Sequence, residues 1–184
     1  MSTAIYKRKS IRLKGYDYSS AGFYFVTVCV QDRECIFGNV VVVGAGPCAR
    51  PEMILNDVGK MIRTVWEQIP NHYPRVDVDS FIVMPNHFHG IIALKSGTGQ
   101  PRGVAPTFGL SLPQIVHRFK SLTTTRYRNG IIQYGWKPFP GRLWQRNYHE
   151  RVIRHENELN EIRKYIEENP LTWDLDPENP NVKT

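Results

Sequence analysis

Long apolar runs are absent from this 184-residue chain, and no stretch approaches the roughly 20 apolar residues that a membrane-spanning helix needs. The basic N-terminal residues are not followed by an apolar core, so the pattern of a secretory signal is also missing. We therefore expect a cytoplasmic protein with no membrane partner. A chain of this length can form one domain, residues 1–184, with a sizeable buried core.

Cysteine is scarce as well. The three cysteines, Cys29, Cys35 and Cys48, form no Cys-x-x-Cys pair and are odd in number. This count argues against a disulfide-stapled secreted fold and against a zinc knuckle. The cysteines are interpreted as reduced thiols.

Acidic residues are nearly missing between Ser111 and Arg154, a segment with nine Lys and Arg and one acidic residue, Glu150. The whole chain has a net charge of +7. Aromatic residues are interleaved with these basic residues, a combination typical of phosphate contacts with base stacking. The segment therefore predicts a nucleic-acid partner. The predicted DNA contacts are Arg118, Lys120, Arg126, Tyr127, Arg128, Arg142, Trp144 and Arg146.

Hydrophobic periodicity and turn residues predict the order of elements. Strands are expected at 22–31, 36–43, 76–84, 87–94 and 143–153. Helices are expected at 56–69, from Ser111 onward and at 156–169, with the first and last stopped by Pro70 and Pro170. Residues 1–20 are expected to be a basic lead-in, 44–51 a surface loop, 95–110 a flexible link and 171–184 a loose tail.

The core order of strand, helix, strand, strand, helix and strand is that of the ferredoxin-like fold. We therefore expect an α+β protein with a split β-α-β antiparallel sheet and an added C-terminal helix. This fold hosts many functions, including plain RNA binding, so it does not decide the chemistry.

His87-Phe88-His89 opens the second strand of the hairpin centred on Pro85 and Asn86. Side chains alternate along a strand, so both imidazoles face the same way and Phe88 faces the other. Such a pair can bind a metal ion. It can equally be two hydrogen-bonded structural histidines.

Tyr165 and Asn169 lie four residues apart and so share one border of the buried stripe of the last helix. They can face a cleft together. Alternatively, the tyrosine ring packs on the sheet and the asparagine caps the helix before Pro170.

Several motifs together resemble the single-tyrosine HUH transposases, and more narrowly their REP-associated, IS200-like branch. These motifs are MPNHFHGII, the ending YIEENP of the last helix, the strand WQRNYHERVI, FKSLTTTRY and the opening KSIRLKGYDYSSAGFYFVT. The resemblance covers nearly the whole chain.

This resemblance implies that Tyr165 is the nucleophile and that His87, His89 and Asn169 bind a divalent metal, Mg²⁺ or Mn²⁺. Tyrosine attack would leave a covalent 5′-phosphotyrosine and a free 3′-OH on single-stranded DNA near a hairpin. A phenol is a weak nucleophile at neutral pH, and a metal that polarises the phosphate offsets this weakness.

Three alternatives stay open from the sequence. Tyr127 and Tyr148 compete with Tyr165 as nucleophile, although neither precedes a polar residue and a helix stop. The chain could also be a non-catalytic nucleic-acid-binding protein, or a metal-dependent hydrolase that uses water. The family includes domain-exchanged dimers, so a monomer and a homodimer are both compatible with the resemblance.

Overall fold

Four strands form one antiparallel sheet in the order β4-β5-β1-β6 in the computed structural model, which describes residues 13, 15–96 and 110–182. The strands are β1 (Gly22–Cys29), β4 (Val76–Val83), β5 (His87–Leu94) and β6 (His149–Ile153). The helices are α1 (Asp57–Glu67), α2 (Ile69–His72), α3 (Leu112–Tyr134) and α4 (Glu156–Glu168). This order confirms the ferredoxin-like fold with an added C-terminal helix. Most of the predicted lead-in and the predicted link at 97–109 lie outside the described residues.

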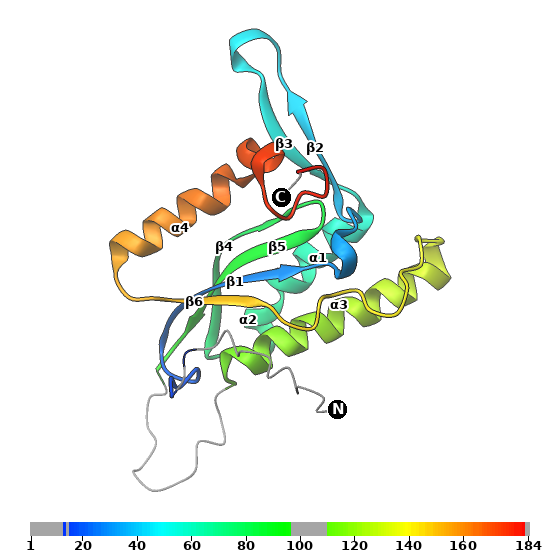
Figure 1. Ribbon diagram of the computed structural model, residues 1–184. Helices are drawn as coiled ribbons and strands as arrows, with labels where there is room; N and C mark the ends of the chain where they lie inside the picture. The colour runs from blue at the N-terminus through cyan, green and yellow to red at the C-terminus, as the bar shows by residue number, and fades with distance from the viewer. Residues whose placement is uncertain (1–12, 14, 97–109, 183–184) are drawn as a thin grey trace, which may run out of the picture.

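Helices cover both faces of the sheet (Figure 1). Tyr24, Val26 and Val28 of β1 point toward α1, α2 and α3, where the larger core forms. Phe23 and Phe25 alternate to the other face and pack near α4 in a smaller core. β1 is therefore covered on both faces, which explains its nearly continuous apolar sequence.

The helix starts follow from capping residues. The side chain of Asn56 accepts a hydrogen bond from the backbone N–H of Gly59 (2.9 Å) and so caps α1. Ser111 and Gln114 form the predicted capping box of α3. Pro70 does not end the helical segment, because it occupies the first turn of the short helix α2, where a proline needs no N–H partner.

A two-stranded hairpin, β2 (Gly38–Val43) and β3 (Arg50–Leu55), is inserted between β1 and α1 and projects from the body (Figure 1). The surface loop expected at 44–51 is therefore shorter than predicted, and its last residues belong to β3. β2 is mostly exposed and β3 is mostly half-buried, so no regular alternation of buried and exposed side chains indicated β3.

The strand predicted at 143–153 is also shorter, since only β6 joins the sheet ladder. Residues 144–148 are irregular, apart from a single bridge between Val30 and Trp144. The ammonium group of Lys120 donates hydrogen bonds to the carbonyl oxygens of Gln145, Arg146 and Asn147. These carbonyls therefore point at a side chain instead of a neighbouring strand.

The tail expected to be loose is folded. A 3₁₀ segment, Asn169–Leu175, follows α4, and the chain then makes two turns in which Asp176 and Asn179 are buried. Each of these side chains accepts a hydrogen bond from the backbone N–H two residues later. Such local bonds hold a turn without regular secondary structure. Among the described residues, no helix combines the length and the apolar character that crossing a membrane requires.

Candidate active site

His87 and His89 lie side by side at the start of β5, as the alternation of strand side chains predicts. Their ring centroids are 4.6 Å apart, and both side chains are buried. Phe88 points to the opposite face and packs on Trp66, with ring centroids 4.5 Å apart. The strand thus uses its two faces for different purposes: one for the core and one for the histidine pair.

The Nδ1 atom of each histidine is held by a neighbouring side chain. His89 Nδ1 lies 2.8 Å from the hydroxyl of Thr27, which is the residue opposite it on β1. His87 Nδ1 lies 3.0 Å from Oδ1 of Asn86. The Nε2 atoms are therefore the ones left to face the site, and His87 Nε2 has no hydrogen-bond partner among the described residues.

Burial lowers the pKa of both histidines. It is the main cause for His89, whose pKa falls well below the ordinary value of 6.5, with His87 adding to the shift. For His87 the nearby carboxylates of Asp176 and Glu178 oppose the effect without cancelling it. Both rings are therefore neutral near pH 7, and a neutral imidazole is the form that binds metals.

The structure brings Tyr165 of α4 to the histidine pair. Its hydroxyl lies 3.3 Å from Nε2 of His89, and its ring meets Phe25 edge-on. Burial raises the pKa of Tyr165, Asp176 raises it further, and the nearby Asn169 amide partly offsets the rise. The residue nevertheless remains 46% exposed, so Tyr165 lies at the surface beside the buried histidines.

Asn169 lies one helical turn after Tyr165 and is only 1% exposed. It influences the pKa of both His87 and Tyr165, which places its amide beside them. Neither polar atom of this amide makes a well-formed hydrogen bond within the described residues. A buried amide without partners is costly, so this arrangement fits a group that binds a ligand.

Asp176 is the site residue that the sequence analysis missed. Its Oδ2 lies 3.8 Å from Nε2 of His87. The candidate ligand atoms of His87, His89 and Asp176 all lie within 4.8 Å of one another, and all three residues are buried. This group can bind a metal ion. Asp-Pro and Asn-Pro pairs at 176–177 and 179–180 were the available signal, because they indicate turns instead of a loose tail.

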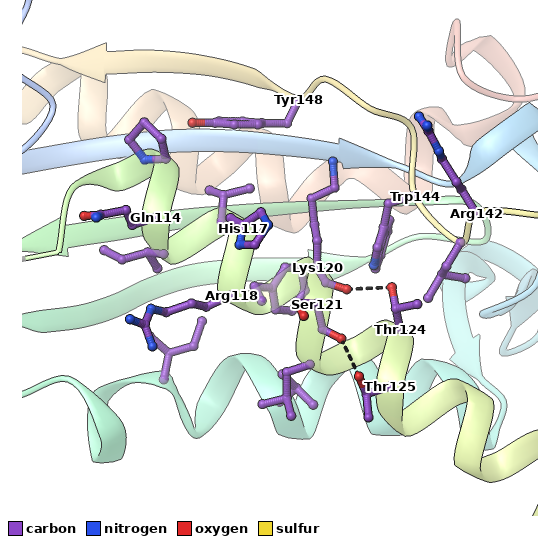
Figure 2. A pocket seen from close by; sticks show the side chains of 18 of the residues that line it. Gln114, His117, Arg118, Lys120, Ser121, Thr124, Thr125, Arg142, Trp144 and Tyr148 are labelled. Carbon is purple, nitrogen blue, oxygen red and sulfur yellow. Dashed lines mark hydrogen bonds between the residues drawn. The ribbon is translucent and has the colours of Figure 1, made fainter.

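A second feature is an open groove of about 1220 Å³ along α3, on the face of the sheet opposite to α4. Figure 2 shows Arg118, His117 and Ser121 on the α3 side, and Arg142 and Tyr148 on the segment that precedes β6. Four of the predicted DNA contacts are exposed and line this groove: Arg118, Arg128, Arg142 and Arg146.

The other predicted DNA contacts form hydrogen bonds within the protein. Tyr127 and Trp144 are buried, and each donates a hydrogen bond, to the Lys137 carbonyl (2.9 Å) and the Thr123 hydroxyl (2.9 Å). Neither ring therefore exposes a face for the base stacking that the sequence predicts for them. Burial lowers the pKa of Lys120 to about 8, and this lysine holds backbone carbonyls.

Arg126 is half-buried and donates a hydrogen bond to the Gln68 side chain (3.0 Å). Of the two rival nucleophiles, Tyr127 lies in the core and Tyr148 lines the α3 groove. Only Tyr165, of these three tyrosines, has a hydrogen bond to the histidine pair.

Comparisons with known proteins identify the family and the fold. Residues 41–169, well over half of the chain, match the family described as "Transposase IS200 like". A Haemophilus influenzae protein without an assigned function is 36% identical over 189 residues, covering 95% of this chain and 94% of that protein. A second protein of that organism, provisionally named a REP-associated tyrosine transposase, is 24% identical over 159 residues, covering 84% and 73%.

A solved structure of a REP-associated tyrosine transposase bound to a REP hairpin has the same fold, with a TM-score of 0.55 and 18% identity. The match covers 88% of this chain and 73% of that one. The family match over most of the chain, together with the relative that is 36% identical, shows that this protein belongs to the IS200-like transposase family.

Proposed function

We propose that this protein is a metal-dependent single-strand DNA endonuclease and transferase in which Tyr165 is the nucleophile. The observation that carries the proposal is the 3.3 Å contact between the Tyr165 hydroxyl and Nε2 of His89, beside buried and neutral donor groups. Attack of the phenolic oxygen on a phosphodiester forms a 5′-phosphotyrosine bond and releases a 3′-OH. The phosphoester bond energy is retained, so a second strand can later replace the tyrosine.

The donor set fits a divalent ion that accepts both nitrogen and oxygen. The imidazoles of His87 and His89 would provide nitrogen, while the Asp176 carboxylate and the Asn169 amide would provide oxygen. We propose Mn²⁺, with Mg²⁺ as the alternative that the oxygen donors allow. When bound, the ion would polarise the scissile phosphate and favour the ionised form of the attacking phenol.

The protein's own residues prepare Tyr165 for this reaction. Burial and Asp176 raise the pKa of Tyr165, so the free protein keeps it as a neutral phenol. The nearby Asn169 amide opposes this rise, and a hydrogen bond from its NH₂ group would stabilise a phenolate. Because Tyr165 and the histidines come from the same chain, we propose that a monomer contains a complete site and that a homodimer is not needed for cleavage.

The α3 groove supports a proposed DNA path for a hairpin substrate. Four exposed arginines line it, whereas the rings of Trp144 and Tyr127 are buried. Such a surface suits the phosphate backbone of a duplex stem. A single-stranded flank would then continue to Tyr165 on the other face of the sheet. The relative bound to a REP hairpin supports this class of DNA.

A labelled oligonucleotide with a hairpin and a single-stranded flank tests the proposal. Incubation with Mn²⁺ is expected to give a covalent protein–DNA adduct that survives denaturation, and EDTA is expected to prevent it. Cleavage without an adduct would instead indicate a hydrolase that uses water. Binding without cleavage at any divalent ion would indicate a DNA-binding protein.

A further inference from the structure

Asn86, the residue before His87, is only 1% exposed, and both its amide nitrogen and its amide oxygen have hydrogen-bond partners. Its amide nitrogen donates to the carbonyl oxygens of Arg33 (3.0 Å) and Glu178 (2.6 Å). Its amide oxygen lies 3.0 Å from Nδ1 of His87. This single side chain therefore joins the turn after β1, the metal-binding strand and the C-terminal segment.

The two carbonyl partners determine how the amide is oriented. A carbonyl oxygen can only accept, so the group that faces Arg33 and Glu178 must be the NH₂ of Asn86. The group that faces His87 is then the amide oxygen, which can only accept. His87 Nδ1 must therefore carry the proton, which leaves Nε2 with the lone pair that a metal needs.

The Arg33 carbonyl reaches Asn86 through a strained turn. Asp32 and Arg33 have φ values of 58° and 56°, a left-handed conformation that non-glycine residues adopt only when their surroundings require it. The Arg33 guanidinium also forms an ion pair with Glu178 (3.2 Å). The backbone of this turn thus binds Asn86, and its side chain binds Glu178.

Glu178 connects Asn86 to Asp176, the third candidate metal ligand. The backbone N–H of Glu178 donates to Oδ1 of Asp176 (2.7 Å), while Oδ2 of Asp176 faces His87. The bond from Asn86 to the Glu178 carbonyl therefore holds the turn that presents Asp176. Other ligands of metal centres are oriented by comparable outer hydrogen bonds.

We propose that Asn86 is a positioning residue that fixes His87 as its Nδ1–H tautomer and holds Asp176 at the same centre. The proposal deepens the metal-dependent function above and rests on it for the role of the metal. The tautomer itself is a property of the metal-free protein and can be measured without activity.

The test is NMR of the metal-free protein labelled with ¹⁵N-histidine at pH 8, where long-range couplings identify the protonated ring nitrogen. His87 is expected to be protonated at Nδ1 and not at Nε2. In Asn86→Ala the acceptor is lost, so the Nε2–H form is expected to become populated. The affinity for Mn²⁺ alone, measured by calorimetry, is expected to fall by roughly 10–100-fold in this variant.

Asp32→Gly is the matched control, because it relieves the left-handed turn and keeps every bond to Asn86. It is expected to change neither the tautomer nor the Mn²⁺ affinity. An Nε2–H tautomer in the wild-type protein would overturn the proposal even if Asn86→Ala failed to fold, and an unchanged tautomer in a folded Asn86→Ala would also overturn it. A wild-type Nδ1–H tautomer without Mn²⁺ binding would refute the metal-dependent function but not the tautomer assignment.

Discussion

The buried histidines set how the site responds to acid. Both His87 and His89 have a pKa below the ordinary value of 6.5, mainly because burial disfavours the charged ring. The unfolded chain therefore binds more protons than the folded protein between that value and the lower folded-state pKa. Stability must rise with pH in this window and be lost as the pH falls through it.

We accordingly predict that the metal-free protein loses unfolding free energy as the pH drops from about 6.5. His89→Gln should flatten this dependence, because glutamine does not titrate. Urea unfolding at several pH values between about 7.5 and 5 checks the prediction. The same slope in wild type and His89→Gln would mean that His89 titrates equally in the folded and unfolded states.

Asp176 is the other residue whose role can be isolated. Asp176→Asn removes the charge and keeps the shape, so Mn²⁺ affinity should fall by about tenfold or more, the scale found for groups around metal sites. Calorimetry with Mn²⁺ measures the change. Asp174→Asn is the control, since Asp174 is exposed in the same segment. Equal affinities for the two variants would remove Asp176 from the metal site.

At the scale of elements, α4 must be held in register for Tyr165 to reach His89. Arg163 does this through two hydrogen bonds to Asp79 of β4, at 2.9 and 2.7 Å. The Arg163 side chain is the main cause that lowers the pKa of Asp79 to about 2, so the pair stays charged at any pH used for assays. Both side chains are partly exposed, which limits the contribution of the pair to stability.

Arg163→Ala should therefore cost about 1 kcal/mol of unfolding free energy, with a larger relative loss of cleavage rate. The reason is that a small shift of α4 displaces the nucleophile while the core stays intact. Chemical denaturation and single-turnover cleavage provide the two measurements. Exchanging the charges, with Arg163→Asp and Asp79→Arg together, should restore part of the rate. A rate loss explained fully by the unfolded fraction would argue against positioning.

The α3 groove gives a further prediction, on DNA binding. If Arg118, Arg128, Arg142 and Arg146 contact phosphates, each Arg→Gln change should lower the salt slope of hairpin binding by about 0.9 for duplex contacts. Lys120→Met is the internal control. It should reduce unfolding free energy by about 1–3 kcal/mol, because three carbonyls lose their donor, and leave the slope of the folded protein unchanged. A quadruple Arg→Gln variant with the wild-type slope would place the DNA elsewhere.

The sequence was sufficient for elements that carry a clear apolar signal. β1 and β5 are apolar on both faces, α1 and α4 have an apolar stripe, and capping residues mark where α1 and α3 begin. β3 and the segment before β6 were misassigned for a physical reason. β3 is half-buried on the projecting hairpin without a regular alternation of buried and exposed residues, and residues 145–147 are bound by a lysine distant in sequence. Neither situation leaves a local pattern.

At the scale of the whole molecule, the site draws on segments that the sequence keeps far apart. Strand alternation predicted that His87 and His89 face the same way, and the family resemblance singled out Tyr165. Asp176 and Glu178 were not, because only the folded chain brings the C-terminal turns to Asn86 and His87. The basic, aromatic segment predicted base stacking by Trp144 and Tyr127. Both rings are buried in the hydrophobic core.

The central claim is that Tyr165 forms the bond to DNA, and mapping the covalent adduct tests it most directly. Wild-type protein is incubated with Mn²⁺ and the hairpin oligonucleotide, digested, and analysed by mass spectrometry for the peptide that retains a nucleotide. We expect a 5′-phosphate on Tyr165 and no adduct in Tyr165→Phe, which should still bind the hairpin with nearly unchanged affinity. A nucleotide on Tyr127 or Tyr148, or an adduct that persists in Tyr165→Phe, would contradict it.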